Sequence, residues 1–181
     1  MSRVAHSVVF ALGAFGMVCA AGVSSNAAPV TVSIVAVVNG DIISNYDLDQ
    51  HIALFAFTSG EPVTQEKLPE IRLQVLTSLE DEKIELQEAG RHKITVTNTE
   101  VDKAVQNLAD DNHVSVEQMV ANVTRAGVSV ITFRANIAAS LIWRKVVTAR
   151  YPEALPGDLD VDAATENYLR DLRRDANVVR R

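Results

Sequence analysis

Cysteine is almost absent from this chain of 181 residues, and the one cysteine, Cys19, lies in an apolar N-terminal segment. Removal of that segment leaves no disulfide, no thiol nucleophile and no thiolate metal site. The sequence also lacks a Gly-x-Ser-x-Gly nucleophile motif and a glycine-rich phosphate-binding loop. These absences exclude the common hydrolase and nucleotide-binding signatures. Aromatic residues make up only 5% of the chain, so we expect a core of alanine, valine, leucine and isoleucine.

Basic residues and histidines are also few. Lysine and arginine number 17 against 23 acidic residues, which gives a net charge of -6. Nucleic-acid binding requires clustered basic residues, so this charge makes a nucleic-acid partner a poor fit. His51, His92 and His113 share no metal-ligand spacing, and His6 lies in the N-terminal segment. We therefore expect solvated surface histidines, no metal and no cofactor.

The N-terminal segment has the parts of a secretory signal. Arg3 supplies a positive start, residues 8–23 are apolar and uncharged, and Ser25 and Ala27 fit a small-x-small cleavage site. We predict a signal peptide over 1–27 that is cleaved after Ala27, a periplasmic location and no stable membrane insertion afterwards. A retained membrane anchor is the alternative, although the run is short for a span of about 20 residues.

The remaining pattern predicts a mainly α fold with a small β-hairpin that a C-terminal strand joins. Asn39-Gly40 between two β-branched runs, 32–38 and 41–44, predicts the hairpin. Apolar residues at helical spacing predict six helices, and an apolar run near the C-terminus of the chain predicts a strand. Ser44, Thr97 and Ser115 each precede an acidic residue or glutamine by three positions and predict helix starts. The predicted helices are 45–58, 65–89, 98–111, 116–126, 130–150 and 162–174, and the strand is 176–180.

The long helix over 65–89 is the element on which the others are expected to pack, and Gly90 is expected to end it in a left-handed conformation. Glu82 interrupts its apolar stripe. Either the helix turns this edge to water, or Glu82 is partly buried and needs a partner. Arg134 and Arg144 lie on the apolar face of the helix over 130–150, so we predict a structural ion pair between Glu82 and one of them.

Three segments resemble, in order and spacing, the N-terminal helical domain of the SurA-type periplasmic chaperones. They are VVNGDIISNYDLDQ at 37–50, LEDEKIELQEAGRHKITVTNTEVDKAV at 79–105 and NHVSVEQMVANVTRAGVSVITFRANIAASLIWRKVV at 112–147. The last 15 residues, NYLRDLRRDANVVRR, resemble the far C-terminal segment of the same family. The resemblance implies a chaperone domain over 28–150 and a C-terminal helix and strand, 162–181, that pack back on it. Parvulin-type prolyl isomerase domains separate these two parts in the family, and here only a linker over 151–161 does.

The resemblance also implies a function. Family members bind unfolded outer-membrane proteins, without ATP, in a groove between helices. Phe55, Phe57 and Met119 are candidates for lining such a groove, because aromatic and methionine side chains form adaptable contact surfaces. The alternative is that all three are ordinary core residues. We expect no catalytic residue. Two other functions stay open: prolyl isomerase activity, and a non-catalytic adaptor that docks one dedicated partner.

Overall fold

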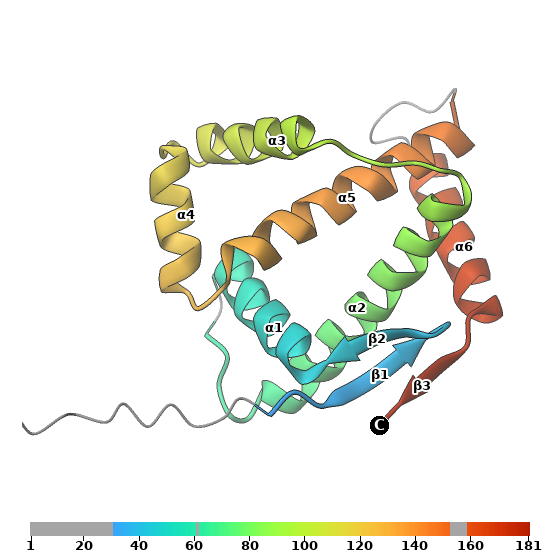
Figure 1. Ribbon diagram of the computed structural model, residues 1–181, viewed down its shortest axis with the longest axis horizontal. Helices are drawn as coiled ribbons and strands as arrows, with labels where there is room; N and C mark the ends of the chain where they lie inside the picture. Colours follow the sequence, from blue (N-terminus) through green and yellow to red (C-terminus); the bar gives the residue numbers. More distant parts are fainter. Residues whose placement is uncertain (1–30, 61, 153–158) are drawn as a thin grey trace, which may run out of the picture. The chain divides into compact units, whose positions relative to one another are not determined.

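The computed structural model describes residues 31–60, 62–152 and 159–181, of which 159–162 are described by their backbone alone. Residues 32–181 form one compact unit. It contains six helices and a small antiparallel sheet, as predicted (Figure 1). The predicted signal peptide, 1–27, lies outside the described residues, as does most of the predicted linker.

Local sequence signals determine where most elements begin. β1 (Ile34–Val38) and β2 (Asp41–Ser44) form the predicted hairpin. Asn39 and Gly40 take φ values of 50° and 99° in the turn between them, as a type I′ turn requires. The predicted capping boxes at Ser44, Thr97 and Ser115 are all present, and they open α1 (Asn45–Ser59), α3 (Asn98–Asp111) and α4 (Val116–Arg125). The side chain of Ser129 caps α5 (Val130–Arg150).

The end of α2 (Leu68–Arg91) differs from the prediction. Gly90 stays helical, and Lys93 takes the left-handed conformation instead, with φ 56°. The amide of Ile94 then donates to the carbonyl of Ala89 at 2.9 Å, which satisfies a carbonyl at the helix end. His113 and Gly127 end α3 and α4 in the same way. Two of these three positions are not glycine, so glycine alone was a poor guide to helix ends.

The C-terminal segment returns to the start of the chain, as predicted. α6 (Leu159–Asp175) packs on α2, and β3 (Val178–Arg180) pairs with β1, so the sheet order is β2-β1-β3 (Figure 1). The turn residue Asn39 fixes this pairing, because its backbone amide donates to the Asn177 carbonyl and its side chain accepts from the Asn177 amide.

Apolar side chains gather in two clusters. One lies between the sheet, α1 and α2, and includes Val38, Ile43 and Leu79. The other lies among α1, α3, α4 and α5, and includes Val105, Val123 and Phe133. α2 contacts α1, α5, α6 and the sheet, and it is the central element. Among the described residues no single helix is long and apolar enough to cross a membrane; α4 and α5 together meet the length and composition criteria but are bent by 112°.

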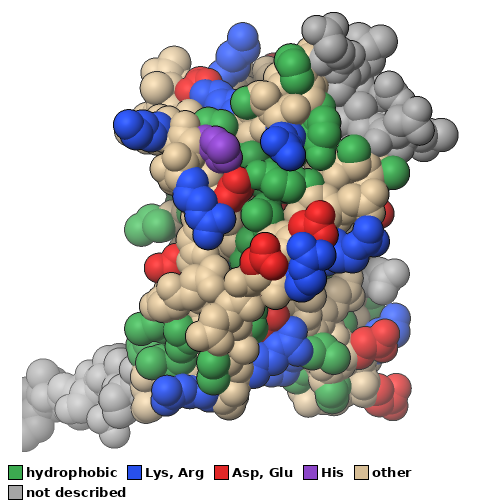
Figure 2. Space-filling view, turned by 90° about the vertical axis from the view of Figure 1, so that its right-hand side faces the viewer, with side chains coloured by type: hydrophobic (Ala, Val, Ile, Leu, Met, Phe, Trp, Pro, Cys, Tyr) green, Lys and Arg blue, Asp and Glu red, His purple; other side chains and the backbone are tan. Residues whose placement is uncertain are grey.

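Ion pairs and a hydrogen bond tie the C-terminal segment to α2. The Arg180 guanidinium donates to both oxygens of the buried Glu80 carboxylate, at 2.7 and 2.6 Å. Arg173 makes a two-pronged ion pair with Asp81, and the Tyr168 hydroxyl donates to Glu88. Figure 2 shows the face that carries α6, where basic and acidic side chains lie together. A buried carboxylate requires such a partner, so the tail completes the fold of α2.

Arg180→Met tests this dependence. The substitution leaves the Glu80 carboxylate buried without its charged partner, so the free energy of unfolding should fall by about 2 kcal/mol. Thermal denaturation should show a midpoint lower by roughly 4–8 °C. Arg174→Met is the matched control, because Arg174 is exposed and, among the described residues, pairs only with its neighbours Asp171 and Asp175. Equal midpoints for the two variants would show that the Arg180 contact does not stabilise the fold.

Candidate functional site

A cavity of about 540 Å³ lies between α1, α2 and α5, with Leu169 of α6 on its border. This volume is in the range of small-ligand and side-chain binding sites. The apolar part of its wall comes from both clusters, since Leu54 belongs to one and Val75 and Leu79 to the other. Phe55 and Trp143 add aromatic surface. The cavity is thus lined by residues of both apolar clusters.

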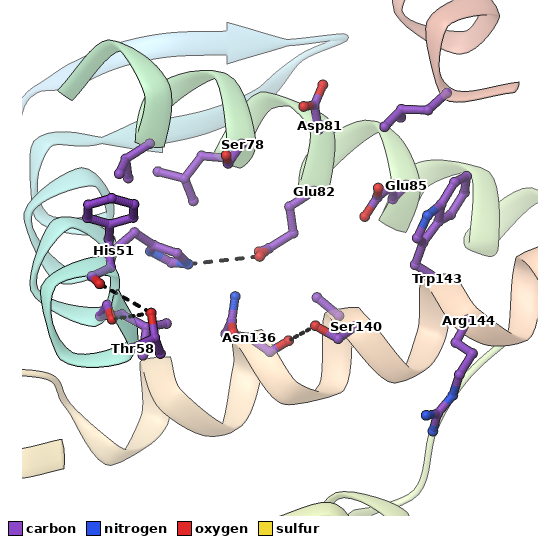
Figure 3. Close-up of a pocket in the computed structure, with 16 residues that line it drawn as sticks. His51, Thr58, Ser78, Asp81, Glu82, Glu85, Asn136, Ser140, Trp143 and Arg144 are labelled. Atoms are coloured by element: carbon purple, nitrogen blue, oxygen red, sulfur yellow. Dashed lines mark hydrogen bonds and ion pairs between the residues drawn. The ribbon is translucent and has the colours of Figure 1, made fainter. Parts of the chain in front are cut away.

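Polar side chains of α1, α2 and α5 converge on this cavity (Figure 3). His51 comes from α1, Glu82 from α2 and Asn136 from α5. His51 Nδ1 lies 2.8 Å from the Asp47 carbonyl, and a carbonyl can only accept, so Nδ1 carries the proton. In the neutral ring, Nε2 is then an acceptor. It is buried without a hydrogen-bond partner among the described residues, 3.9 Å from Glu82 Oε2.

Burial raises the pKa of Glu82, while the charge that His51 carries when it is protonated, the charge of Lys83 and the Asn136 amide act to lower it. His51, Leu79 and Glu82 also line a second cavity of about 340 Å³, on the side of Tyr46 and Ile131. These three residues are therefore the wall between the two cavities. The wall presents two facing acceptors, an imidazole nitrogen and a carboxylate oxygen, to any group that enters.

Glu85 is one turn further along α2 and also borders the larger cavity. Within the described part of the chain it has no ion-pair or hydrogen-bond partner. Burial, with a smaller contribution from the neighbouring Asp81 and Glu82, raises the pKa of Glu85 to about 7, while Arg173 acts in the opposite direction. Arg173 is itself bound to Asp81. Glu85 is thus a carboxyl group that changes charge near neutral pH.

An aromatic stack positions Trp143 in the wall. Its ring lies parallel to that of Tyr168, with centroids 5.9 Å apart and an interplanar angle of 13°. The Arg150 guanidinium lies over the Tyr168 ring, 5.4 Å from the centroid. Burial acts to raise the pKa of Glu88, but hydrogen bonds from Tyr168, His92 and Arg91 outweigh it and lower the pKa. The ionised Glu88 carboxylate therefore accepts the hydrogen bond from the Tyr168 hydroxyl, and the Tyr168 ring stacks on Trp143.

The structure separates the three predicted groove residues. Phe55 lines the cavity, and its part in binding stays a prediction. Phe57 packs against the second apolar cluster and lines none of the described cavities. Met119 is only 5% exposed and belongs to the same cluster. The assignment of Met119 to a groove was wrong, because its helical spacing places it in the core.

The predicted ion pair of Glu82 is also wrong. Arg134 binds Asp102 of α3 at 2.6 Å. Figure 3 shows the Arg144 guanidinium directed away from Glu82, and no ion pair joins the two among the described residues. The partner of Glu82 is His51, which was expected on the solvated surface and is instead mostly buried. Among the described residues the buried glutamates are Glu80 and Glu88. Arg180 binds Glu80, and Tyr168 binds Glu88 together with Arg91 and His92.

Sequence reasoning missed His51, Glu85 and Trp143 as cavity residues. His51 gives no spacing signal, because its neighbours in the cavity come from other helices. Glu85 follows Glu82 by three positions, which places both on one face of α2, and this was an available signal. Trp143 is the single tryptophan of the chain. A lone tryptophan on a helix that also carries polar residues was a second available signal.

Comparison with known proteins identifies the family. The model of the SurA N-terminal domain matches residues 32–147, and the chain belongs to this family. Chaperone SurA of Legionella pneumophila strain Paris is 30% identical over 80% of this chain and 33% of its own length. Chaperone SurA of Burkholderia lata is 28% identical over 90% of the chain and 36% of its own length. The chain thus spans about a third of the length of these curated relatives.

Among solved structures, a SurA-like chaperone of Campylobacter jejuni is 24% identical. The similarity has a TM-score of 0.41 and covers 68% of this chain and 44% of the other.

Glu85→Gln tests the electrostatics of the cavity. The pKa of Glu85 in the folded state, about 7, lies above its ordinary value of 4.5, so the folded protein binds more protons between these values. Its contribution to the free energy of unfolding therefore falls as pH rises through this window. At pH 8 the variant should be more stable than the wild type by about 1 kcal/mol, or roughly 3 °C, after allowance for partial exposure.

The gain should shrink to a small remainder near pH 4.5, where the wild-type carboxyl is neutral in the folded state and half protonated in the unfolded state. Thermal denaturation at pH 4.5, 6 and 8 checks this. Glu70→Gln removes the same charge from the exposed start of α2 and should show no such pH-dependent gain. A Glu85→Gln stability difference that is constant with pH would contradict the raised pKa.

Proposed function

We propose that this protein is a periplasmic, ATP-independent chaperone that holds unfolded outer-membrane proteins and has no isomerase activity. The observation that carries the proposal is the cavity between α1, α2 and α5, in a domain of the SurA N-terminal family. Its aromatic and aliphatic wall suits apolar side chains of an extended segment. Chaperone SurA is the name of the curated relatives. Export with cleavage after Ala27 belongs to the same proposal.

Holding a client requires no chemistry. A protein that binds the unfolded chain lowers its free concentration by mass action, and aggregation slows accordingly. The cavity has openings on the surface of one compact unit, so an extended chain can insert one or two side chains while its backbone stays outside. Two further features support this mode: the exposed Tyr46 and Ile131 border the adjoining cavity, and apolar contact is non-directional and tolerates varied sequences.

Light scattering of an unfolded outer-membrane β-barrel protein, diluted into buffer with and without the chain from residue 28, tests the proposal. We expect suppressed aggregation at stoichiometric concentration. A prolyl-isomerisation assay on a short peptide runs in parallel and should show no rate above background. Absent suppression would overturn the chaperone function, and isomerase activity would overturn its non-enzymatic part.

Trp143→Ala identifies the site of binding. Loss of this aromatic wall should weaken client affinity by about tenfold, as truncation of a central aromatic contact does elsewhere. Fluorescence anisotropy of a labelled, unfolded client measures the affinity. Leu73→Ala is the control, because Leu73 is an exposed apolar residue of α2, 56% exposed, that does not line the cavity. Equal affinities for both variants would place client binding elsewhere on the surface.

A further inference from the structure

We infer that the cavity between α1, α2 and α5 binds a basic side chain of the client, lysine or arginine, that lies beside an aromatic or aliphatic residue. The inference rests on the proposed chaperone function and adds a selectivity to it. Glu82 and Glu85 are the residues that select the cation, and Trp143 is the wall against which its apolar stem packs.

The first support is an excess of hydrogen-bond acceptors in the cavity. His51 Nε2 and Glu82 Oε2 face each other at 3.9 Å, and Nε2 is buried without a donor among the described residues. Glu85 likewise has no donor in the described chain. The Asn136 amide is the donor that acts on Glu82. An ammonium group offers three donors and a guanidinium five, whereas an aromatic or aliphatic side chain offers none to these acceptors.

The second support is charge. α2 directs three carboxylates to the cavity, Asp81, Glu82 and Glu85. Arg173 of α6 neutralises Asp81, and Arg144 of α5 points away from the other two (Figure 3). The other groups whose charge acts on Glu82 are His51, which is charged only when it is protonated, Lys83, which faces the second cavity, and Asp47. Glu82 and Glu85 therefore form a desolvated negative site, which attracts a cation more strongly than an exposed carboxylate does.

The third support is the aromatic stack. Arg150, Tyr168 and Trp143 form a column in which a cation lies on one aromatic ring and that ring lies on the next. Trp143 borders the cavity beside Glu85 (Figure 3). A lysine or arginine stem can pack on this ring while its charged end reaches the carboxylate, and a tryptophan ring also attracts cations directly. The cavity, at about 540 Å³, has room for this side chain and an apolar neighbour.

The test uses capped peptides that contain no tryptophan and differ in one central residue, arginine or its neutral isostere citrulline, with phenylalanine beside it. Trp143 is the only tryptophan of the chain, so its emission reports binding at this cavity. At pH 8 the arginine peptide should bind the full chain roughly tenfold more tightly than the citrulline peptide, as expected for hydrogen bonds between charged groups. Both should change the emission of Trp143.

The double variant Glu82→Gln/Glu85→Gln keeps the shape of the cavity and removes its charge. The preference for arginine should fall from about tenfold to less than twofold. Glu70→Gln, the same change at the exposed start of α2, should keep the full preference. Lowering the pH to 5.5 should reduce the preference in the wild type, because Glu85 becomes protonated, and should leave the double variant unchanged. The comparison of the two peptides on the wild type stands even where the double variant does not fold.

The outcomes separate this inference from the proposed function. Equal binding of both peptides, with a change in Trp143 emission, overturns the selectivity and leaves the chaperone site in place. An unchanged Trp143 emission together with suppressed aggregation of the unfolded client also overturns it, because the client then binds elsewhere. If neither peptide binds and aggregation of the unfolded client is not suppressed, both the selectivity and the proposed chaperone function are overturned. An arginine preference that survives the double variant contradicts the roles of Glu82 and Glu85.

Discussion

The tie between α2 and the end of the chain is the interaction on which the rest of the structure depends. Glu80 and Glu88 are buried on α2. Glu80 would be a costly isolated charge without Arg180, and Glu88, which Arg91 and His92 also bind, accepts a further hydrogen bond from Tyr168. The same contacts place α6 against α2. α6 contributes Leu169 to the cavity and, through Tyr168, the support of Trp143. Residues from the last 14 positions thus complete a site whose other walls come from the middle of the chain.

One helix carries glutamates with opposite roles, and its periodicity explains how. Thr77, Glu80 and Ile84 face the C-terminal segment with Arg180, whereas Ser78, Glu82 and Glu85 face the cavity. Each set follows the spacing of one helical face. Arginine reaches the first face and neutralises it. No arginine or lysine pairs with Glu82 or Glu85 in the described chain, so burial raises the pKa of both carboxyls. Environment, not residue type, separates the carboxylates of α2 that are bound to the C-terminal segment from those whose pKa is raised by burial.

Much of the fold was predictable because it depends on local chemistry. The Asn39-Gly40 turn and the capping boxes at Ser44 and Thr97 follow from short sequence signals, whereas the return of the C-terminal strand was implied by the family resemblance. The site was less predictable, because its contacts join helices far apart in the sequence. Placing Arg134 on an apolar face did not reveal that Asp102 lies nearer than Glu82. His51 could not be distinguished from a surface histidine until α1 and α2 were placed together.

Selectivity for a lysine or arginine beside an apolar residue would let a chaperone of this kind accept many client sequences and still bind each one at a defined position. Apolar contact is non-directional and accepts many sequences, so the aliphatic and aromatic wall alone discriminates little among unfolded segments. The acceptors that α1 and α2 hold in place act differently, because they favour a segment that brings a donor to one position and stay unsatisfied with one that brings none. A carboxyl with a pKa of about 7 also makes the anchor weaken as pH falls, while the apolar contacts persist. Client release and client choice would then respond to different parts of the same cavity.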